Sequence, residues 1–292
     1  MNTDSLSGKT VAITGSTGGL GREICSYLAS LGANLILLDR NEKRSQDHKD
    51  SLIEKYGIEV SLIRLDLEDI RSAKDAADRL ITSGVDIFIH NAGAYSIPRH
   101  KCETGYDNVF QINFVSPYYI IRQLMPALRE REGRCVVVGS IAHNYSVIDE
   151  NDIDFSNKEA ASKVYGNAKR YLMFSLFELF KNEEKVTLSV THPGITFTNI
   201  TSHYPKLIFA VIKYPMKVIF MKPRKAALSV IDGVFGKAEY CEWFGPRLFD
   251  IWGYPNKKPL RTCSFEERSK IADISRSVYK KCLQTLGENT EL

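Results

Sequence analysis

Short apolar runs alternate with longer amphipathic stretches through the first two thirds of the chain, and this alternation limits the possible fold more than any other feature. The runs, rich in β-branched residues, cover residues 10–14, 35–38, 60–65, 85–90, 135–139 and 186–191. The stretches with helical periodicity cover about residues 20–31, 41–56, 69–82, 105–131 and 158–184. Strands that alternate with helices in this way form βαβ crossovers, and continuous apolar runs are typical of strands covered on both faces. We therefore expect an α/β fold with a doubly wound, mainly parallel sheet.

The pattern becomes less regular after residue 192. We expect a loop over 192–204, an apolar stretch at 206–222, a helix over 223–236, a turn-rich segment with Trp, Phe, Gly and Pro at 242–260, and a closing helix over 264–284. No repeat, low-complexity segment or Gly/Ser/Pro-rich linker marks a boundary. The sequence therefore predicts a single domain over residues 1–292.

The charge balance argues against a nucleic-acid partner. The 292 residues include 39 Lys and Arg against 35 Asp and Glu, a net charge of +4, and no run of basic residues is longer than a pair. A protein that binds nucleic acid usually concentrates positive charge on one face or along one helix. We therefore expect no nucleic acid to bind.

Cysteine usage and the lack of a signal segment favour a cytoplasmic protein. The six cysteines lie far apart, with no CxxC pair and no zinc-like Cys/His spacing, so we expect reduced thiols and no metal. Residues 1–9 lack the apolar stretch of a signal peptide. The stretch at 206–222 is interrupted by Lys213, Pro215 and Lys217 and is shorter than the roughly 20 residues that a membrane span needs. It would form a core helix, cover an apolar pocket or touch a membrane surface.

A glycine-rich turn directly follows the first apolar run. It consists of Thr14-Gly15-Ser16-Thr17-Gly18-Gly19-Leu20-Gly21, and a helix is expected to begin near Leu20. Glycines let the backbone turn sharply and approach a pyrophosphate, and the free N–H groups of a helix N-terminus attract the anion. The spacing is GxxxGxG rather than GxGxxG. In this strand–turn–helix context it predicts a dinucleotide site with contacts at Gly15, Ser16, Thr17, Gly19, Leu20 and Gly21.

Two charged residues at the end of the second run bear on which dinucleotide binds. Asp39 would accept hydrogen bonds from the adenosine ribose and repel a 2′-phosphate, which favours NAD. Arg40 would pair with a 2′-phosphate or stack on adenine, which admits NADP. Because Gly18, not a basic residue, precedes Gly19, the sequence favours NAD and leaves NADP open. The alternative is that Asp39 caps the helix over 41–56 and Arg40 is solvated.

A contact to adenine is expected after the third run, where Asp66 and Leu67 follow one another. The Asp66 carboxylate would suit the edge of the adenine ring. The alternative is that Asp66 caps the helix over 69–82, because Asp is a favoured N-cap residue.

A YxxxK motif occurs twice, as Tyr165/Lys169 and as Tyr254/Lys258. The second contains Pro255, lies in the turn-rich segment and has no serine partner upstream, so we interpret it as a chance match. The first lies in a predicted helix, where residues i and i+4 share a face.

Together, these motifs resemble the short-chain dehydrogenases/reductases over about residues 7–250. The pattern comprises the glycine-rich turn, Asn91-Ala92-Gly93, Asn113, Ser140, Tyr165 with Lys169, and Pro193-Gly194. Segments 112–128, 139–143, 153–169 and 186–200 further resemble the retinol-dehydrogenase-like branch and related hydroxysteroid dehydrogenases. The resemblance implies a single Rossmann domain with a dinucleotide-binding core over 1–192, a substrate-binding loop or lid and the end of the fold over 193–260, and a C-terminal helix over 261–292.

The resemblance implies a hydride-transfer site. Tyr165 would take the alcohol proton in oxidation or donate it in ketone reduction, and Lys169 with the positive nicotinamide would lower the pKa of Tyr165. Lys169 would also hold the nicotinamide ribose, Ser140 would orient the substrate oxygen, and Asn113 would anchor a water molecule. Taken singly, Ser140 would also suit a strand-end cap, Asn113 a helix kink before Pro117, and Tyr165 with Lys169 a solvated helix face.

The resemblance adds cofactor contacts at Asn91, Ala92, Gly93, Tyr165, Lys169, Pro193, Gly194, Ile195 and Thr198. The backbone of Ile195 and the hydroxyl of Thr198 would meet the carboxamide and diphosphate. One position departs from the family, because His90 stands where an asparagine is usual. A neutral imidazole can replace the hydrogen bonds of that amide, so we interpret His90 as structural.

In this family the segment after Pro193-Gly194 closes over the substrate, and here it is strongly apolar. Its apolar side chains are Phe197, Tyr204, Leu207, Ile208, Phe209, Ile212, Tyr214, Met216, Ile219, Phe220 and Met221. Covering an apolar molecule removes this surface from water, which is favourable. We therefore expect a secondary alcohol or ketone on a steroid, bile-acid or related terpenoid frame, with retinoid alcohols as the alternative.

Other readings stay open. A dinucleotide-binding sensor without chemistry would keep the turn, although it would have no reason to keep Ser140, Tyr165 and Lys169 together. An enzyme at a membrane surface would use 206–222 as an interfacial helix. The resemblance also implies a homo-oligomer, a dimer or tetramer, paired through the helices over 105–131 and 158–184, whose apolar residues would equally suit an ordinary core.

Overall fold

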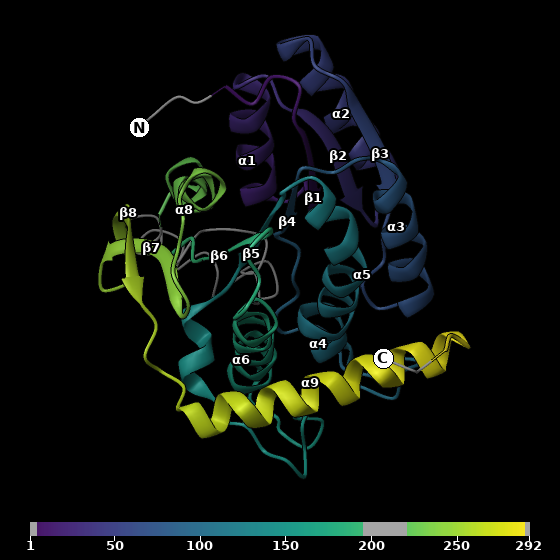
Figure 1. Ribbon diagram of the computed structural model, residues 1–292, viewed down its shortest axis with the longest axis vertical. Helices are drawn as coiled ribbons and strands as arrows, with labels where there is room; N and C mark the ends of the chain where they lie inside the picture. Colours follow the sequence, from purple (N-terminus) through teal and green to yellow (C-terminus); the bar gives the residue numbers. More distant parts are fainter. Residues whose placement is uncertain (1–4, 195–220, 290–292) are drawn as a thin grey trace, which may run out of the picture.

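The computed structural model describes residues 5–194 and 221–289, which build an eight-stranded sheet with helices on both faces (Figure 1). The strands are β1 (Thr10–Thr14), β2 (Asn34–Asp39), β3 (Val60–Arg64), β4 (Ile87–His90), β5 (Arg134–Val138), β6 (Thr187–Thr191), β7 (Glu242–Leu248) and β8 (Trp252–Pro259). Their order across the sheet is β3-β2-β1-β4-β5-β6-β7-β8. All neighbours pair in parallel except β7 and β8, which are antiparallel. The predicted doubly wound, mainly parallel sheet is confirmed.

Two hydrophobic cores separate the sheet from its two helical layers. One core packs the sheet against α1 (Gly19–Ser30), α2 (Glu42–Tyr56) and α8 (Pro223–Phe235), and the other against α3 (Ile70–Thr82), α5 (Ser116–Glu130) and α6 (Ala161–Leu179). Successive side chains of a strand point to opposite faces. In β1, Val11 and Ile13 accordingly enter the first core and Ala12 the second. This is why the strands read as continuous apolar runs.

The predicted helices are present, with ends shifted by a few residues. The residues that cap two of them differ from those considered in the sequence analysis. Asn41 caps α2 by accepting a hydrogen bond from the Arg44 N–H at 3.0 Å, and Asp69 caps α3 through the Arg71 N–H at 2.8 Å. The alternatives in which Asp39 and Asp66 cap these helices are therefore wrong.

The helix predicted over 105–131 is three consecutive pieces. A short α4 (Asn108–Phe110) leads into a π-helical turn, η1 (Gln111–Val115), and then into α5. Asn113 lies in the π-helical turn, where its side chain donates a hydrogen bond to the Val109 carbonyl at 2.8 Å. A side-chain bond to a helix carbonyl competes with the regular backbone ladder, which helps to explain the wider turn.

The expectation of an irregular segment at 242–260 is wrong, because β7 and β8 form a hairpin there. β8 lies at the edge of the sheet. An edge strand tolerates proline because one side of its backbone has no strand to bond, so Pro255 and Pro259, which suggested turns, fit into it. Residues 195–220, with most of the proposed lid, lie outside the described part of the chain.

The C-terminal helix α9 (Phe265–Leu286) lies across the outer side of α5 and α6 (Figure 1, yellow). Its Ile271, Val278 and Cys282 belong to the same core as these helices, and the Tyr279 ring lies 5.8 Å from that of Tyr119 on α5. This helix therefore occupies part of the surface through which the resemblance implies pairing of two subunits. Within residues 5–194 and 221–289, no helix is both long enough and apolar enough to span a bilayer.

Candidate active site

The predicted site residues gather at the carboxyl ends of the parallel strands. Thr14 ends β1, Asp39 ends β2, His90 ends β4, and Ser140 follows β5. The order of the sheet reverses between β1 and β4. In open α/β sheets, ligands bind outside the strand ends at such a reversal.

The glycine-rich turn is packed so tightly that side chains would not fit at two of its positions. Gly15 has a φ of +71°, and a Cβ there would lie 3.0 Å from the Ala92 Cα. A Cβ on Gly21 would lie 2.2 Å from the Gly15 carbonyl oxygen. Gly18, the N-cap of α1, provides no side chain to bond the first N–H groups of the helix. The turn thus presents bare backbone donors at the strand edge, as binding of a pyrophosphate requires.

A buried hydroxyl joins the turn to the segment after β4. Thr14 Oγ1 accepts hydrogen bonds from the N–H groups of Asn91 and Ala92, both at 3.0 Å, and lies 3.1 Å from His90 Nδ1. Since the hydroxyl already accepts two bonds, its own proton points to Nδ1, and the neutral imidazole carries its proton on Nε2. Burial, with the Lys169 charge, holds the pKa of His90 well below its ordinary value, so the ring is neutral. The Asn91 amide completes the junction by donating to the Thr14 and Gly15 carbonyls at 3.0 and 3.1 Å.

The Asp39 carboxylate bonds to the turn itself. It accepts hydrogen bonds from the Ser16 hydroxyl at 2.5 Å and from the N–H and hydroxyl of Thr17 at 3.2 and 3.1 Å. These contacts attach the turn to the end of β2 and were not foreseen in the sequence. The neighbouring Arg40 is exposed and lies 3.5 Å from the Glu68 carboxylate.

Other predicted contact residues are positioned mainly by their backbone. Leu20 and Leu67 bury their side chains in the cores on the two sides of the sheet. Asp66 is half-buried, and its carboxylate accepts a hydrogen bond from the Glu68 N–H at 3.2 Å. Gly19 is exposed at the start of α1.

Ser140, Tyr165 and Lys169 lie together. Ser140 caps the 3₁₀-helix η2 (Ile141–Tyr145) by accepting from the Ala142 N–H at 3.1 Å, so the strand-end cap is real, and its side chain also hydrogen-bonds to Tyr165. Lys169 is buried, donates from Nζ to the Val138 carbonyl at 2.9 Å, and lies 5.7 Å from the centroid of the Tyr165 ring. The Tyr95 ring packs against the Tyr165 ring in an edge-to-face arrangement, with 5.4 Å between the two ring centroids.

The pKa of Tyr165, expected to fall under Lys169 together with the positive nicotinamide, is raised in the protein alone. Burial raises the pKa of Tyr165 to about 12, although the hydrogen bond with Ser140 acts in the opposite direction. Burial likewise lowers the pKa of Lys169 to about 8. Desolvation disfavours the charged form of each group. In the protein alone, both shifts therefore favour the neutral forms.

Asn113 connects the segment after β4 to the region around Lys169. Its amide donates to the Ala94 carbonyl at 2.8 Å, and its oxygen accepts from the Ala94 N–H at 3.3 Å. A Cβ on Gly93 would lie 2.7 Å from the Asn113 oxygen and 3.7 Å from Lys169 Nζ. Gly93, Asn113 and Lys169 are therefore immediate neighbours, as the predicted pattern requires.

A polar cluster that the sequence analysis missed lies next to Ser140 and Lys169, and its Arg170 and His143 side chains are buried. Arg170, next to Lys169, donates from Nε and one terminal nitrogen to the Glu267 carboxylate of α9 at 2.6 and 2.5 Å, and also bonds the His143 and Thr262 carbonyls at 3.2 and 2.7 Å. The His143 ring lies 2.6 Å from the Ser140 carbonyl and 2.7 Å from the Thr262 hydroxyl. The one sequence feature that could have indicated this cluster is Arg170, a charged residue within an otherwise apolar face of the predicted helix.

The segment after β6 begins next to the hairpin. Pro193 and Gly194 are buried, Gly194 has a φ of +77°, and a Cβ there would lie 2.7 Å from the Ile251 carbonyl oxygen. The predicted contacts at Ile195 and Thr198 lie outside the described residues. Within the described ranges, no three His, Cys, Asp or Glu side chains are grouped so as to hold a metal ion.

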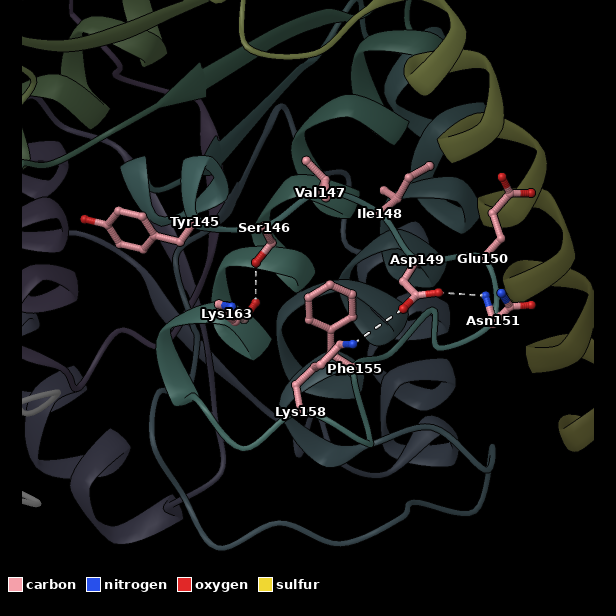
Figure 2. A pocket seen from close by; sticks show the side chains of 10 residues that line it. All are labelled: Tyr145, Ser146, Val147, Ile148, Asp149, Glu150, Asn151, Phe155, Lys158 and Lys163. Atoms are coloured by element: carbon pink, nitrogen blue, oxygen red, sulfur yellow. Dashed lines mark hydrogen bonds and ion pairs between the residues drawn. The ribbon is translucent and has the colours of Figure 1, made fainter.

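A separate pocket of about 440 Å³ lies between η2 and the start of α6. Figure 2 shows its lining, which includes Tyr145, Phe155 and Lys158 and the hydrogen bond from Ser146 to the Lys163 carbonyl. The three residues Ser140, Tyr165 and Lys169 are not part of this lining.

Comparison with known proteins identifies relatives of this arrangement. A family model described as short chain dehydrogenase matches residues 9–206. Retinol dehydrogenase 14 of Mus musculus is 30% identical over 214 residues, which cover 68% of this chain and 64% of that protein. Short-chain dehydrogenase TIC 32 A, chloroplastic, of Brassica napus is 29% identical over 210 residues, which cover 66% of each chain. The chain therefore spans slightly less than two thirds of the length of these curated relatives.

The fold also has a solved counterpart. A crystal structure of an uncharacterised protein from Mycobacterium paratuberculosis aligns over 100% of this chain and 98% of its own, with a TM-score of 0.76 and 22% sequence identity. At this identity the likeness concerns the fold alone.

Proposed function

Because the chain belongs to the short-chain dehydrogenase family, we propose that it is an NAD(P)-dependent oxidoreductase that interconverts a secondary alcohol and a ketone on a bulky lipophilic substrate. The observation that carries the proposal is the meeting of Ser140, Tyr165 and Lys169 at the strand edge that also bears the glycine-rich turn. A protein that only bound a dinucleotide would have no use for this arrangement.

The residues at this edge fit a dinucleotide. The turn has uncapped N–H groups at the start of α1 and no room for side chains at Gly15 and Gly21. Its backbone would hold the pyrophosphate, the segment from Asn91 to Gly93 and the Lys169 ammonium would hold the nicotinamide half, and Asp39 and Arg40 would meet the adenosine ribose. When bound, the nicotinamide accepts or supplies the hydride.

The proton of the reaction is assigned to Tyr165. With a pKa of about 12 in the protein alone, the phenol keeps its proton at neutral pH and is ready to donate it to a ketone oxygen. Ser140, which hydrogen-bonds to Tyr165, would orient the same oxygen. Lys169 has a pKa of about 8, so at pH 7 it is mostly cationic and would stabilise the phenolate that donation leaves behind.

The substrate class rests on the apolar surroundings of Tyr165. Tyr95 packs on its ring, and Ile97 and Ile141 lie partly buried at the edge of the core nearby. The segment expected to cover the site has the apolar composition described above. We favour a hydroxysteroid or bile-acid type of substrate. The similarity to retinol dehydrogenase 14 favours a retinoid alcohol as the second candidate.

The preferred cofactor is proposed to be NAD, with NADP as the alternative. A carboxylate at Asp39 repels a 2′-phosphate, and its bonds to Ser16 and Thr17 keep it at the mouth of the turn. Arg40 is exposed and only loosely paired with Glu68, which leaves its guanidinium available to a 2′-phosphate.

The test is turnover of hydroxysteroids, bile acids, retinol and short aliphatic alcohols, followed by nicotinamide absorbance with NAD and NADP in parallel. Turnover is expected with one lipophilic class. Tyr165→Phe should lower it about 10²- to 10⁴-fold, because it removes the proton donor. The matched control is Tyr254→Phe, in the second YxxxK motif, which should leave turnover unchanged. A Tyr165→Phe enzyme within a few-fold of wild type would refute the assignment.

A further inference from the structure

The tip of the β7–β8 hairpin, residues 247–254, exposes large apolar side chains. Phe249 is 84% exposed, Tyr254 is 67% exposed and Leu248 is 55% exposed. Figure 1 shows the hairpin at one edge of the molecule, next to α8. Single exposed apolar residues are ordinary, but several within one short turn mark a surface that binds something apolar.

The backbone of this tip is held in an uncommon conformation. Phe249 and Asp250 have φ values of +53° and +58°, in the left-handed region that a bulky side chain such as Phe seldom adopts. A hydrogen bond from the Ile251 N–H to the Leu248 carbonyl at 3.0 Å closes the turn. The Asp250 carboxylate is held 2.6 Å from Lys258 Nζ. Strain of this kind persists where it serves a function, and here it presents Phe249 to solvent.

Basic side chains lie in this apolar tip and beside it, at Arg247 and Lys225. In the described part of the chain, the ion pairs on the hairpin are Lys258 with Asp250 and Lys257 with Glu242. Within residues 221–259, the exposed bases without a carboxylate in such a pair are Lys222, Arg224, Lys225, Lys237 and Arg247. Lys225 Nζ lies 5.2 Å from the centroid of the Tyr254 ring, so positive charge directly adjoins the exposed aromatic surface.

The tip also lies on the same side of the sheet as the candidate active site. β7 runs parallel to β6, so its carboxyl end and the following turn lie at the edge where Ser140 follows β5. His192, just after β6, stacks on Trp243 of β7 and has its Nε2 3.0 Å from the Asp250 carbonyl oxygen. A surface that received the tip would therefore face the mouth of the site.

We propose that the hairpin tip docks on a lipid surface with anionic headgroups, with Leu248 and Phe249 entering the interface and the neighbouring bases contacting the headgroups. Aromatic side chains favour the boundary between headgroups and acyl chains, and each Lys or Arg near an anionic surface adds to the attraction. A stable protein interface buries about 800 Å² on each partner, more than a narrow turn offers. A bilayer accepts such a turn without a matching shape.

Co-sedimentation of the full-length protein with vesicles tests this proposal. The probes are vesicles of phosphatidylcholine alone and of phosphatidylcholine with phosphatidylserine, each at low and high salt. Wild type should sediment with the anionic vesicles, and less so at high salt. Leu248→Ser/Phe249→Ser should weaken this binding about tenfold or more. Lys225→Gln/Arg247→Gln should weaken it by a similar factor on anionic vesicles only.

A matched control tests whether vesicle binding needs the hairpin tip or only an exposed apolar side chain anywhere on the surface. Phe265, at the start of α9, is 66% exposed, and Phe265→Ser should sediment as wild type does. Wild type that stays in the supernatant with both vesicle types would overturn the proposal and leave a protein partner as the reason for the tip. Vesicle binding that survives both double substitutions would overturn it as well, because another part of the chain would then carry the attachment.

Discussion

The glycine-rich turn and helix α6 are both held by polar contacts of buried side chains, but the partners of these side chains come from different distances along the chain. At the turn, Thr14 and Asp39 bond to residues of the motifs themselves, such as Asn91 and Ser16. At α6, Arg170 reaches Glu267, 97 residues later. The His143 ring behind Ser140 reaches Thr262, 119 residues later. The motifs thus include the residues that stabilise the turn. They do not include Thr262 and Glu267, which stabilise α6 and the segment behind Ser140.

The largest loss of stability is expected when the contact between Arg170 and Glu267 is broken. Arg170 is buried and Glu267 is half-buried, so Arg170→Met should cost about 3 kcal/mol, the lower end of the 3–5 kcal/mol range for breaking a buried pair. The free energy of unfolding, measured by urea denaturation, should fall by about this amount. The double substitution Arg170→Met/Glu267→Met removes both charges and should recover most of the loss. If Arg170→Met alone were as stable as wild type, the ion pair would not stabilise the packing of α9 on α6.

The same pair predicts a pH dependence. Burial acts against ionisation of Glu267, but hydrogen bonds from Arg170 outweigh it and hold the pKa of Glu267 below its ordinary value. A carboxyl with a depressed pKa stabilises the fold above its unfolded pKa, about 4.3, and this contribution is lost as the pH falls through the folded pKa. The stability gap between wild type and Arg170→Met should therefore narrow on acidification below about pH 4. A constant gap would contradict the ion-pair account.

A smaller loss is expected at the turn. Thr14→Val keeps the shape of the side chain but removes the hydroxyl that bonds Asn91, Ala92 and His90. Leaving buried donors without a partner costs about 1–3 kcal/mol. Urea denaturation and dinucleotide binding by calorimetry should both report the loss, and Thr14→Ser should restore most of it. If Thr14→Val lost as much stability as Arg170→Met, the turn and α6 would not differ in how strongly their contacts stabilise the fold.

The smallest effect on stability is expected for Asp39→Asn. One oxygen remains to accept from Ser16 or Thr17, so the loss should be about 1 kcal/mol. The missing negative charge should move the ratio of kcat/KM values from NAD toward NADP, because a 2′-phosphate is no longer repelled. An unchanged ratio would mean that Arg40 alone decides the preference.

The parts of the fold that could be predicted from sequence are those whose physical cause is local. Continuous apolar runs mark buried parallel strands because helices cover both of their faces, and Gly15 and Gly21 mark a turn where a Cβ has no room. The hairpin was missed because Pro255 and Pro259 indicate turns, and proline is tolerated in β8 only because it is an edge strand.

At the candidate site, the residues could be predicted but their electrostatics could not. Tyr165 and Lys169 share one face of α6, as their spacing indicates. From the sequence we expected Lys169, together with the positive nicotinamide, to lower the pKa of Tyr165. In the chain alone, burial raises the pKa of Tyr165 to about 12, and this burial depends on Tyr95 and the surrounding core rather than on the motif.

The contact between α6 and α9 affects how the protein folds during synthesis. The ribosome completes α6 at Leu179 long before it reaches Thr262 and Glu267. Helix α6 therefore emerges without these partners and is secured only after residues 262–267 have emerged as well. A premature stop codon shortly before position 262 would leave every motif residue in the product and remove the contacts that hold their helix. For this protein, a fragment that contains the whole catalytic pattern is no evidence of an active enzyme.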